Sequence, residues 1–450
     1  MPARTDAPVG TPRRAPLLGS RGGASFRDIA PLALTILLVV AATVASCAPK
    51  PDVNVMGSAA PGEPEMRVRV GKEQNEATLD AASAITVWTS RSVDRAANLK
   101  GPLRVRVGET GWVITDASGA SRGFPRAEPL FLRPAGATSI RYSNAEYPGM
   151  FRLYARDDVS AGVFDIVEHL ALEQYLPGVL AKELPAGWSP AAFEAQAVAA
   201  RTYAMQERQR RLAAGAVYDV EATDRDQVYG GMTANPKLLA AVRATRGKAV
   251  TFNGVLLRAY FSSTCGGRPA SAKDIWPTTK GMEFNLMPPI QGKPREFACE
   301  SSPLYRWKVE RDAADLLRRI VAWGEQEQLA VRQMTSLARI QPVELNEAQR
   351  PNKYRLSDAA GKHWTLTAEQ LRNACNFGGG KFAPVTRQTR VHSGDFEVEI
   401  KGPVATFTGR GFGHGVGLCQ YCAEGFARKG EDCATILRRF YPGAAITQQY

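Results

Sequence analysis

The sequence lacks several patterns that would assign it at once to a common functional class. Its 450 residues contain no internal repeat, no low-complexity tract beyond a short Pro/Gly/Ala-rich segment, and no Gly-Lys-Ser/Thr phosphate loop. The missing repeat argues against solenoid and propeller architectures, which need similar units at a fixed period. The missing Gly-Lys-Ser/Thr argues against nucleotide binding of the P-loop type, where the lysine holds phosphates.

Dense runs of lysine or arginine are also missing, although the formal net charge is +13. Such an excess favours polyanionic surroundings, such as nucleic acid, anionic lipid or an acidic cell-wall polymer, and scattered surface charge explains it equally well. The sequence has no aromatic–basic motif of the kind that nucleic-acid-binding proteins use. We therefore expect no nucleic-acid partner.

One long apolar run near the N-terminus, residues 32–45, is short for a membrane-spanning helix. Five arginines precede this run, and four of them, Arg13, Arg14, Arg21 and Arg27, form the basic region before it. Ser46 and Cys47 follow it, and a small residue before a cysteine at this place resembles a bacterial lipoprotein signal. We expect residues 1–46 to be a signal peptide and Cys47 to carry a lipid, giving an exported, membrane-anchored lipoprotein that faces the cell wall or periplasm. An uncleaved anchor helix and cleavage near Ala48 are the alternatives.

Cysteine is scarce, with seven residues in the chain. If Cys47 is lipidated, six remain: Cys265, Cys299, Cys375, Cys419, Cys422 and Cys433. An even number in an exported protein permits three disulfides, and it also permits one metal site plus a pair. The Cys-x-x-Cys spacing of Cys419 and Cys422 favours a metal, whereas export favours disulfides. Both interpretations stay open.

Hydrophobic periodicity divides the rest of the chain. Residues 47–66 are rich in Pro, Gly, Ala and Ser and are expected to form a flexible tether. Residues 67–150 alternate apolar and polar side chains at period two, which predicts a β-rich N-terminal region. Residues 151–450 are expected to form the second, larger domain.

The period then changes to that of helices. Residues 170–184 read as helical, and Ser189-Pro190 is a strong start signal for an alanine-rich helix over 191–212. Asn253-Gly254 predicts a β-hairpin. A charged, helix-rich insertion is expected at 312–340, followed by strands, and a final helix at 418–440. Together these patterns predict an α+β fold with a β-rich N-terminal lobe.

Glu183 is the most informative polar residue because it ends an apolar helical run. A lone carboxyl group between apolar walls has a raised pKa and is suited to act as a general acid near neutral pH. The alternative is a solvated carboxylate that pairs with Lys182. Glu173 is a rival acid, but it lies early in the helical stretch, where the macrodipole keeps a carboxylate ionised.

A glycine-rich segment, residues 409–421, lies between a predicted strand and a predicted helix. Its glycines allow tight turns and a close backbone approach to a ligand. We expect His414, in the middle of this segment, to contact a ligand, a metal or the catalytic carboxylate, and a structural role in capping the next helix is the alternative. Asp224 and Asp226 lie on a polar loop, where they either bind sugar hydroxyls or are solvated charges.

Seven segments follow one another in a specific order: Glu173-Gln-Tyr-Leu-Pro-Gly-Val, Lys182-Glu-Leu-Pro, Ala195-Gln-Ala-Val-Ala-Ala-Arg-Thr-Tyr, Tyr260-Phe-Ser-Ser-Thr-Cys-Gly-Gly, Ser302-Pro-Leu-Tyr-Arg-Trp, Gly411-Phe-Gly-His-Gly-Val-Gly-Leu-Cys-Gln and Ile436-Leu-Arg-Arg-Phe-Tyr-Pro-Gly. Together they resemble the stage II sporulation protein D family of peptidoglycan lytic transglycosylases. The resemblance is strongest at 164–265 and 405–445, and it is poor at 67–150 and 312–340.

The resemblance implies a substrate cleft between sheet and helices, and cleavage of the bond between N-acetylmuramic acid and N-acetylglucosamine with formation of 1,6-anhydro ends. A hydrolase of this bond normally needs two carboxyl groups. Here the muramyl 6-hydroxyl is the nucleophile, so Glu183 alone serves as acid and then base. The family's "amidase enhancer" label implies the alternative, a non-catalytic wall-binding module that recruits or stimulates a peptidoglycan amidase.

The resemblance also implies further site residues. The candidates for substrate binding are Gln196, Arg201, Tyr203, Trp188, Tyr260, His414 and Gln420. Arg201 is expected to hold the lactyl carboxylate or to buttress Glu183, and core packing is the alternative for Tyr203 and Trp188. Some members of the family carry zinc on Cys and His ligands, which implies one structural zinc, not needed for the chemistry, on Cys265, Cys299, Cys419 and Cys422, with His414 in reserve.

Overall fold

The computed structural model describes residues 61–91, 93, 96–136, 139–379 and 382–450. The predicted signal peptide, the predicted lipidation site Cys47 and most of the predicted tether lie outside the described residues. The first strand, β1, begins at Glu65, so the end of the predicted tether is already strand. Within the described residues, no helix combines the length and apolar character needed to cross a bilayer.

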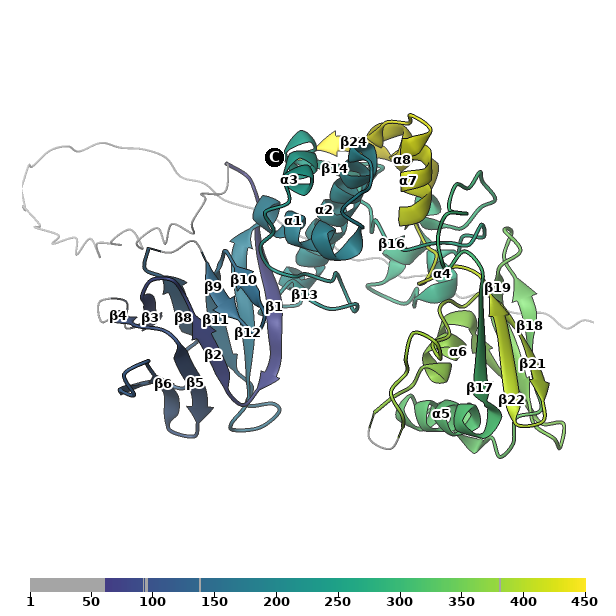
Figure 1. Cartoon of the computed structure of the whole chain (residues 1–450), viewed down its shortest axis with the longest axis horizontal. Helices are drawn as coiled ribbons and strands as arrows, with labels where there is room; N and C mark the ends of the chain where they lie inside the picture. Colours follow the sequence, from purple (N-terminus) through teal and green to yellow (C-terminus); the bar gives the residue numbers. More distant parts are fainter. Residues whose placement is uncertain (1–60, 92, 94–95, 137–138, 380–381) are drawn as a thin grey trace, which may run out of the picture. The chain divides into compact units, whose positions relative to one another are not determined.

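The N-terminal half is built on two large sheets (Figure 1). The first has the order β13-β1-β12-β11-β8-β3-β4, with bounds Val220–Glu221, Glu65–Gln74, Phe164–Ala171, Met150–Ala155, Leu130–Pro134, Ile85–Thr89 and Ala97–Leu99. The second has the order β10-β9-β2-β5-β6-β7, with bounds Ala145–Tyr147, Ile140–Tyr142, Ala77–Asp80, Leu103–Gly108, Gly111–Thr115 and Ser121–Phe124. Along β5 the side chains alternate between buried and exposed, as the period-two pattern predicts. Because β11 and β12 pair with each other and β12 pairs with β1, the first sheet continues past residue 150.

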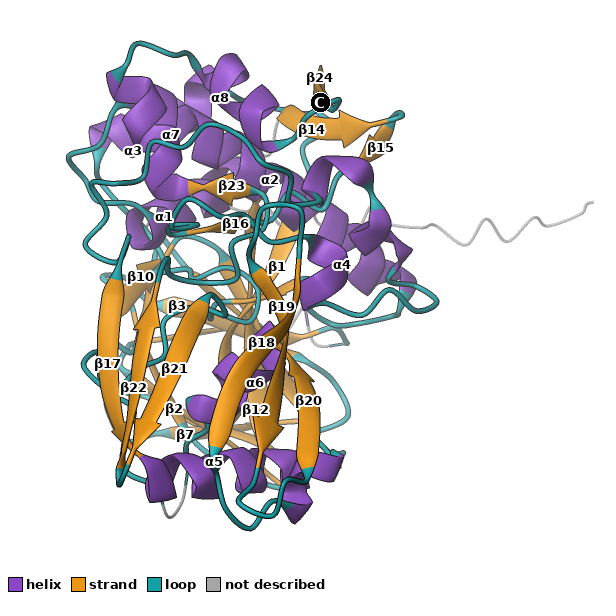
Figure 2. Ribbon diagram, turned by 90° about the vertical axis from the view of Figure 1, so that its right-hand side faces the viewer, coloured by secondary structure: helices purple, strands orange, loops and turns teal. Residues whose placement is uncertain are grey.

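Helices pack around α2, which contacts α1, α3, α7 and α8; Figures 1 and 2 show these helices side by side. Their bounds are Leu172–Glu183 for α1, Pro190–Ala213 for α2, Pro236–Ala244 for α3, Gln420–Arg428 for α7 and Cys433–Phe440 for α8. Ser189 is the N-cap of α2 and Pro190 its first residue, which confirms the predicted start. The expected helix at 418–440 is instead two helices. Gly430, with φ of 92°, lies in the turn between them.

Short strands and turns connect these helices. The hairpin of β14 (Lys248–Phe252) and β15 (Val255–Leu256) turns at Asn253 and Gly254, which have φ of 51° and 79°. Positive φ at both positions is what a type I′ turn requires, so the predicted hairpin is confirmed. The remaining elements are β24 (Ala445–Gln448), which pairs with β14, β16 (Phe261–Ser262), which pairs in parallel with β23 (Leu418–Cys419), α4 (Ala272–Ile275), η2 (Glu283–Leu286) and η3 (Pro288–Ile290).

Residues 307–409 form a region with a hydrophobic core of its own. One sheet has the order β17-β22-β21, with bounds Trp307–Asp312, Val404–Gly409 and Phe396–Lys401. The other has the order β18-β19-β20, with bounds Arg339–Leu345, Pro351–Ser357 and His363–Thr367, and the helices are α5 (Ala313–Gln326), η4 (Ala330–Gln333) and α6 (Ala368–Cys375). The helix-rich insertion predicted at 312–340 is thus α5 and η4 within this larger region. The architecture as a whole is α+β, as predicted.

Candidate functional site

Glu183 is the last residue of α1. The apolar side chains of this helix, including Leu176, Val179 and Leu180, are fully buried, and they fix the helix end against the core. The chain then leaves in an extended conformation at Leu184, which leaves the Glu183 side chain partly buried at the helix terminus. It forms no ion pair within the described residues, so it does not pair with Lys182 as the solvated alternative requires.

Two hydrogen bonds hold the Glu183 carboxyl group. Gln420 donates from Nε2 to Oε2 over 3.0 Å, and the backbone of Val228 also bonds to the group. Burial raises the pKa of Glu183, and this effect outweighs the lowering by the two hydrogen bonds. The site therefore favours a protonated carboxyl group at higher pH than usual, which is what a general acid needs.

The glycine-rich segment explains how Gln420 reaches Glu183. Glycines 411, 413, 415 and 417 all have φ between 72° and 92°. At Gly417 an added Cβ would lie 2.0 Å from the carbonyl oxygen of Tyr260, so only glycine allows this close approach. The turn delivers the chain to β23 and then to Gln420 at the start of α7.

A polar loop, residues 222–230, also contacts Glu183. Gln227 anchors it, because its Nε2 donates to the carbonyl of Ala200 over 3.2 Å and its Oε1 accepts from the hydroxyl of Tyr175 over 3.2 Å. Val228 follows and bonds to Glu183, whereas Asp226 and Asp224 line a cavity of about 330 Å³. The loop thus joins the candidate acid to this cavity, which we call the aromatic cavity.

Aromatic side chains form much of the aromatic cavity. Tyr260 stacks on Trp276 with ring centroids 3.9 Å apart, and His414 lies edge-on to Trp276 at 4.8 Å. The Nδ1 atom of His414 accepts a hydrogen bond from the backbone N–H of Val416, and burial lowers the pKa of His414 to about 4. The imidazole is therefore neutral. Tyr203 completes the wall, and its hydroxyl accepts from Arg258 over 2.8 Å and donates to Asp226 over 3.2 Å.

Sequence reasoning missed Trp276, which faces both Tyr260 and His414. The signal was a single tryptophan in a proline-rich loop, and no periodicity marks it. Apolar ring faces beside polar groups suit a sugar, because a pyranose presents C–H groups on one face and hydroxyls at its edge. Burial also raises the pKa of Asp226, a carboxyl group that lines the same cavity.

Arg201 does not lie at the cavity or beside Glu183. Its side chain is fully buried, and its Nε and one terminal nitrogen each donate to Glu173 over 2.8 Å. Burial alone would raise the pKa of Glu173. The hydrogen bonds from Arg201 and the positive charge of Arg201 outweigh burial, so the pKa of Glu173 is lowered. The structure thus corrects the expectation for Arg201. It forms an ion pair of the core, and Glu173 is the ionised partner instead of a rival acid.

Two other candidates are also inside the protein. Gln196 on α2 is 1 % exposed, and neither amide atom has a hydrogen-bond partner among the described residues. Trp188 is 7 % exposed, and its ring packs edge-on against Tyr421 at 5.0 Å. Trp188 therefore packs inside the protein, between the start of α2 and α7.

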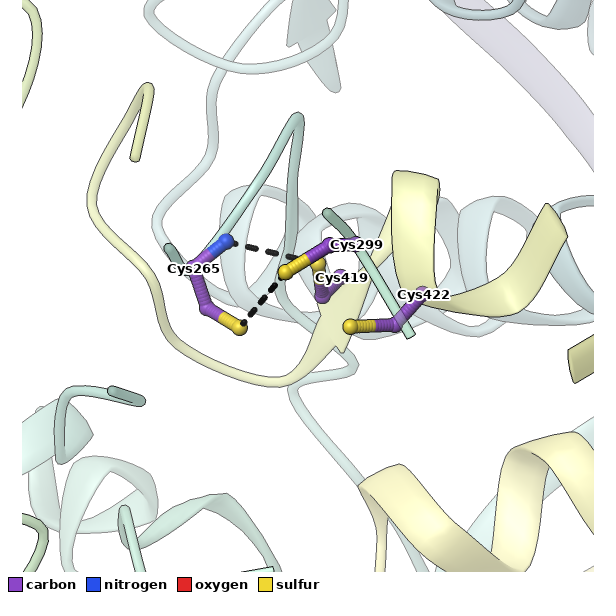
Figure 3. Close-up of side chains that lie close together, drawn as sticks. All are labelled: Cys265, Cys299, Cys419 and Cys422. Atoms are coloured by element: carbon purple, nitrogen blue, oxygen red, sulfur yellow. Dashed lines mark hydrogen bonds between the residues drawn. The ribbon is translucent and has the colours of Figure 1, made fainter. Parts of the chain in front are cut away.

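The four cysteines predicted as metal ligands lie together (Figure 3). The Sγ atoms of Cys265, Cys299, Cys419 and Cys422 are all buried and all within 4.8 Å of one another. The Cys265 and Cys299 Sγ atoms are 3.9 Å apart, and the backbone N–H of Cys265 donates to Sγ of Cys419 over 3.3 Å. A tetrahedral zinc site with Zn–S bonds of about 2.3 Å has sulfur atoms about 3.8 Å apart, so the cluster fits such an ion.

The other cysteine alternatives are not borne out. None of the six cysteines in the described part of the chain forms a disulfide, which contradicts the three-disulfide interpretation. Cys375 is buried in the core of the 307–409 region, and Cys433 lies partly exposed on α8. Hydrogen bonds from Cys265, Cys419 and Cys422 lower the pKa of Cys299. His414 is no member of the cluster, so the reserve ligand is not used.

Comparisons with known proteins agree with this arrangement. Residues 160–252, which include α1, Glu183 and α2, match the family model described as stage II sporulation protein. The chain is 29 % identical to stage II sporulation protein D of Bacillus subtilis over 296 residues, which cover 63 % of this chain and 76 % of that protein. It is 27 % identical over 291 residues to the amidase enhancer of the same organism, covering 60 % of this chain and 40 % of the relative.

The site and fold thus define an α+β protein in which one partly buried carboxyl group, a glycine-rich turn and a cluster of four cysteines share a single framework. Residues 160–252 match the stage II sporulation protein family, and the similarity to the two Bacillus subtilis relatives supports that assignment.

Proposed function

We propose that this protein is a lytic transglycosylase that cleaves the glycosidic bond between N-acetylmuramic acid and N-acetylglucosamine in peptidoglycan glycan strands. The observation that carries the proposal is the Glu183 carboxyl group, whose pKa burial raises and whose Oε2 accepts from Gln420. The names of the relatives, which refer to sporulation and to enhancement of an amidase, support a role at the cell wall.

One carboxyl group is enough for this reaction if the substrate supplies the nucleophile. Protonated Glu183 gives its proton to the glycosidic oxygen while the bond from that oxygen to the muramyl C1 breaks. The resulting Glu183 carboxylate then takes the proton of the muramyl 6-hydroxyl as its oxygen bonds to C1. The product is a 1,6-anhydro ring, no water is consumed, and Glu183 returns to its protonated form.

The residues around Glu183 have separate tasks in this scheme. Gln420 donates to Oε2 in both protonation states, so it orients the carboxyl group and stabilises the carboxylate that forms midway. The aromatic cavity, with Tyr260, Trp276 and His414, is the proposed subsite for a sugar ring of the strand. Its link to Glu183 through the loop of Asp226 and Val228 supports this assignment.

The cysteine cluster is proposed to hold one structural zinc ion. The four buried cysteines would hold the ion and leave no position for substrate, so the ion would cross-link the chain and supply no catalytic chemistry. The remaining parts of the proposal are export and anchoring to the membrane through a lipid on Cys47, with no nucleic-acid partner.

A second candidate function is a non-catalytic wall-binding module that stimulates a peptidoglycan amidase. The name of one relative, amidase enhancer, favours it. It needs the aromatic cavity but not the protonation state of Glu183.

Digestion of peptidoglycan and of peptide-free glycan strands, read by mass spectrometry, tests the two functions. The purified protein is compared with the Glu183→Gln variant, which keeps the shape of the side chain and an acceptor oxygen but has no acidic proton. Anhydro-muramyl ends made only by the wild type support the transglycosylase. Ends that carry an added water would indicate a hydrolase, with Asp226 or Asp224 as the second carboxyl group to examine. No cleavage by either protein, with strand binding intact, would favour the amidase-stimulating module.

A further inference from the structure

A second cavity, of about 380 Å³, lies on a different set of residues from the aromatic cavity. Its lining includes Ser263, Ser302, Phe412 and Tyr421 from outside the 307–409 region, and Arg387, Arg390 and His392 from within that region. We call it the arginine cavity. Its volume falls within the range of about 300–1,000 Å³ that is typical of ligand pockets.

The arginine cavity has positive charge that nothing nearby neutralises. Neither Arg387 nor Arg390 has an acidic partner within 4 Å among the described residues. Other arginines of the same region do have one, since Arg311 and Arg319 both pair with Asp315, at 3.2 and 2.7 Å. Two unpaired guanidinium groups on one cavity wall are the arrangement that binds carboxylates or phosphates.

His392 provides an independent observation in the same cavity. It is 4 % exposed, and its Nδ1 has no hydrogen-bond partner among the described residues. Its ring lies edge-on between Trp307, at 5.4 Å, and Phe412, at 5.6 Å, which fixes its orientation. A buried polar group without a partner is costly, and a ligand that supplies an acceptor or donor removes that cost.

The wall that carries these cations is held firmly in place. Asn376 donates to the carbonyl of Val391 over 2.8 Å and accepts from its N–H over 2.9 Å. Arg311 donates to the carbonyl of Thr389 over 2.9 Å, and the N–H of Gly413 donates to the carbonyl of His392 over 3.0 Å. The last contact ties the wall to the glycine-rich segment that leads to Gln420.

The arginine cavity also adjoins the candidate active site. Tyr421, which lines it, follows Gln420 in the chain and packs against Trp188. Its N–H donates to the carbonyl of Ser263, another lining residue, over 3.0 Å. The cavity and the Glu183 carboxyl group are thus joined through two consecutive residues of α7, Gln420 and Tyr421.

We propose that the arginine cavity binds a carboxylate of the glycan substrate, with Arg387 and Arg390 as its recognition residues and His392 at its base. This inference rests on the proposed function, because it takes a glycan strand as the ligand. Two carboxylates are available on such a strand. One is the lactyl carboxylate of muramic acid, which is free only where the stem peptide has been removed. The other is a carboxylate of the stem peptide itself.

The cysteine cluster lies directly behind this cavity. Ser263 precedes Cys265 by two residues, Ser302 donates its N–H to the carbonyl of Cys299 over 3.0 Å, and Tyr421 lies between Cys419 and Cys422. Each of these three wall segments therefore contains a cysteine of the cluster. An ion in the cluster would hold the three wall segments together.

Binding measurements on the full chain test the proposal without relying on cleavage. All variants carry Glu183→Gln, so that strands stay intact, and the test pair is Arg387→Gln with Arg390→Gln. The control is Arg339→Gln with Arg355→Gln, which removes the same charge from exposed, unpaired arginines on β18 and β19. The probes are peptide-free glycan strands, strands that keep their stem peptides, and a neutral chitin oligosaccharide of equal length.

We expect the test pair to weaken binding of one carboxylate-bearing strand by about tenfold or more, since charged hydrogen bonds are lost, while the control and the chitin oligosaccharide show little change. A loss confined to peptide-free strands assigns the lactyl carboxylate, and a loss confined to peptide-bearing strands assigns the stem peptide. An equal loss for all probes, no loss for any, or no strand binding at all overturns the proposal.

A second measurement locates the carboxylate. The chain has four histidines, so ¹³C-labelled histidine gives few signals. If the lactyl carboxylate is the ligand, N-acetylmuramic acid should shift the His392 signal, whereas N-acetylglucosamine, which lacks that carboxylate, should not. If a stem-peptide carboxylate is the ligand, the free stem peptide should shift the signal instead. If the wild type forms no anhydro ends in the digestion experiment but these binding differences are observed, the transglycosylase proposal is refuted and the carboxylate site is retained.

Discussion

Glu168 offers a prediction about stability that does not depend on the proposed function. This residue lies on β12 and is fully buried. Its Oε1 accepts from the N–H of Gly149 over 2.8 Å. Burial raises the pKa of Glu168 from its usual value near 4.5 to about 8, against smaller lowering effects of Gly149 and Tyr229. The carboxyl group is therefore protonated in the folded protein at neutral pH.

The sign of the pH dependence follows from proton binding. Between the two pKa values the folded chain holds a proton at Glu168 and the unfolded chain does not, so the free energy of unfolding falls as pH rises. The contribution of Glu168 to the free energy of unfolding is fully present below about pH 4.5 and is lost as the pH rises to about 8. At about 1.4 kcal/mol per pH unit, the loss between pH 5 and pH 8 is about 3.5 kcal/mol. This is a large share of the about 5–15 kcal/mol that stabilises a typical domain.

Urea denaturation at pH 5 and at pH 8 measures this effect. The Glu168→Gln variant keeps an acceptor for the N–H of Gly149 but has no proton to lose. From pH 5 to pH 8 its free energy of unfolding should therefore fall by about 3.5 kcal/mol less than that of the wild type. Glu109→Gln, at an exposed turn, is the control and should follow the wild type. If Glu168→Gln and the wild type lose the same stability from pH 5 to pH 8, the carboxyl group is already ionised in the folded protein and the reasoning is wrong.

Three further predictions concern the site and its support. Gln420→Met removes the hydrogen-bond donor to Glu183 Oε2, so the pKa of Glu183 should rise further. The fall of kcat/KM on the alkaline side should then move to higher pH. An unchanged pH profile would show that Gln420 does not lower the pKa of Glu183. Arg201→Met leaves Glu173 buried without its partner and should cost about 3 kcal/mol or more in urea denaturation, whereas Arg201→Met with Glu173→Gln should recover part of it. Cys419→Ser should lower the zinc content measured by elemental analysis and lower the Tm, whereas Cys433→Ser, outside the cluster, should change neither.

Local signals in the sequence were enough to predict local structure. Ser189-Pro190 set the start of α2, and Asn253-Gly254 set a hairpin turn, because in each case the backbone preference of two adjacent residues decides the outcome. The predicted helix at 418–440 was wrong in one respect. Apolar periodicity continues on both sides of Gly430, and the pattern alone does not show that the chain turns there.

Contacts between distant segments were harder to predict. Gln420 lies 237 residues from the Glu183 that it contacts, and no spacing rule connects them. Arg201 on α2 pairs with Glu173 on α1, 28 residues earlier in the chain, and no sequence pattern indicates this pairing, so the arginine was expected to bind substrate. The Cys-x-x-Cys motif marked two members of the cluster, whereas Cys265 and Cys299 come from separate loops. Arg387, Arg390 and His392 follow a loop without periodicity, and only the fold brings them to one cavity.

The glycine-rich segment connects these separate features. On one side its Gly413 bonds to the backbone of His392, and Phe412 bridges to Thr264, next to Cys265. On the other side it continues to Cys419 and Gln420. We therefore expect a change at the cysteine cluster to act on Glu183 through the position of Gln420. For this reason loss of an ion from the cluster should lower kcat of the proposed reaction although no cysteine contacts the substrate. Adding zinc back to the chelated protein should restore both kcat and the position of the Gln420 side chain that donates to Glu183.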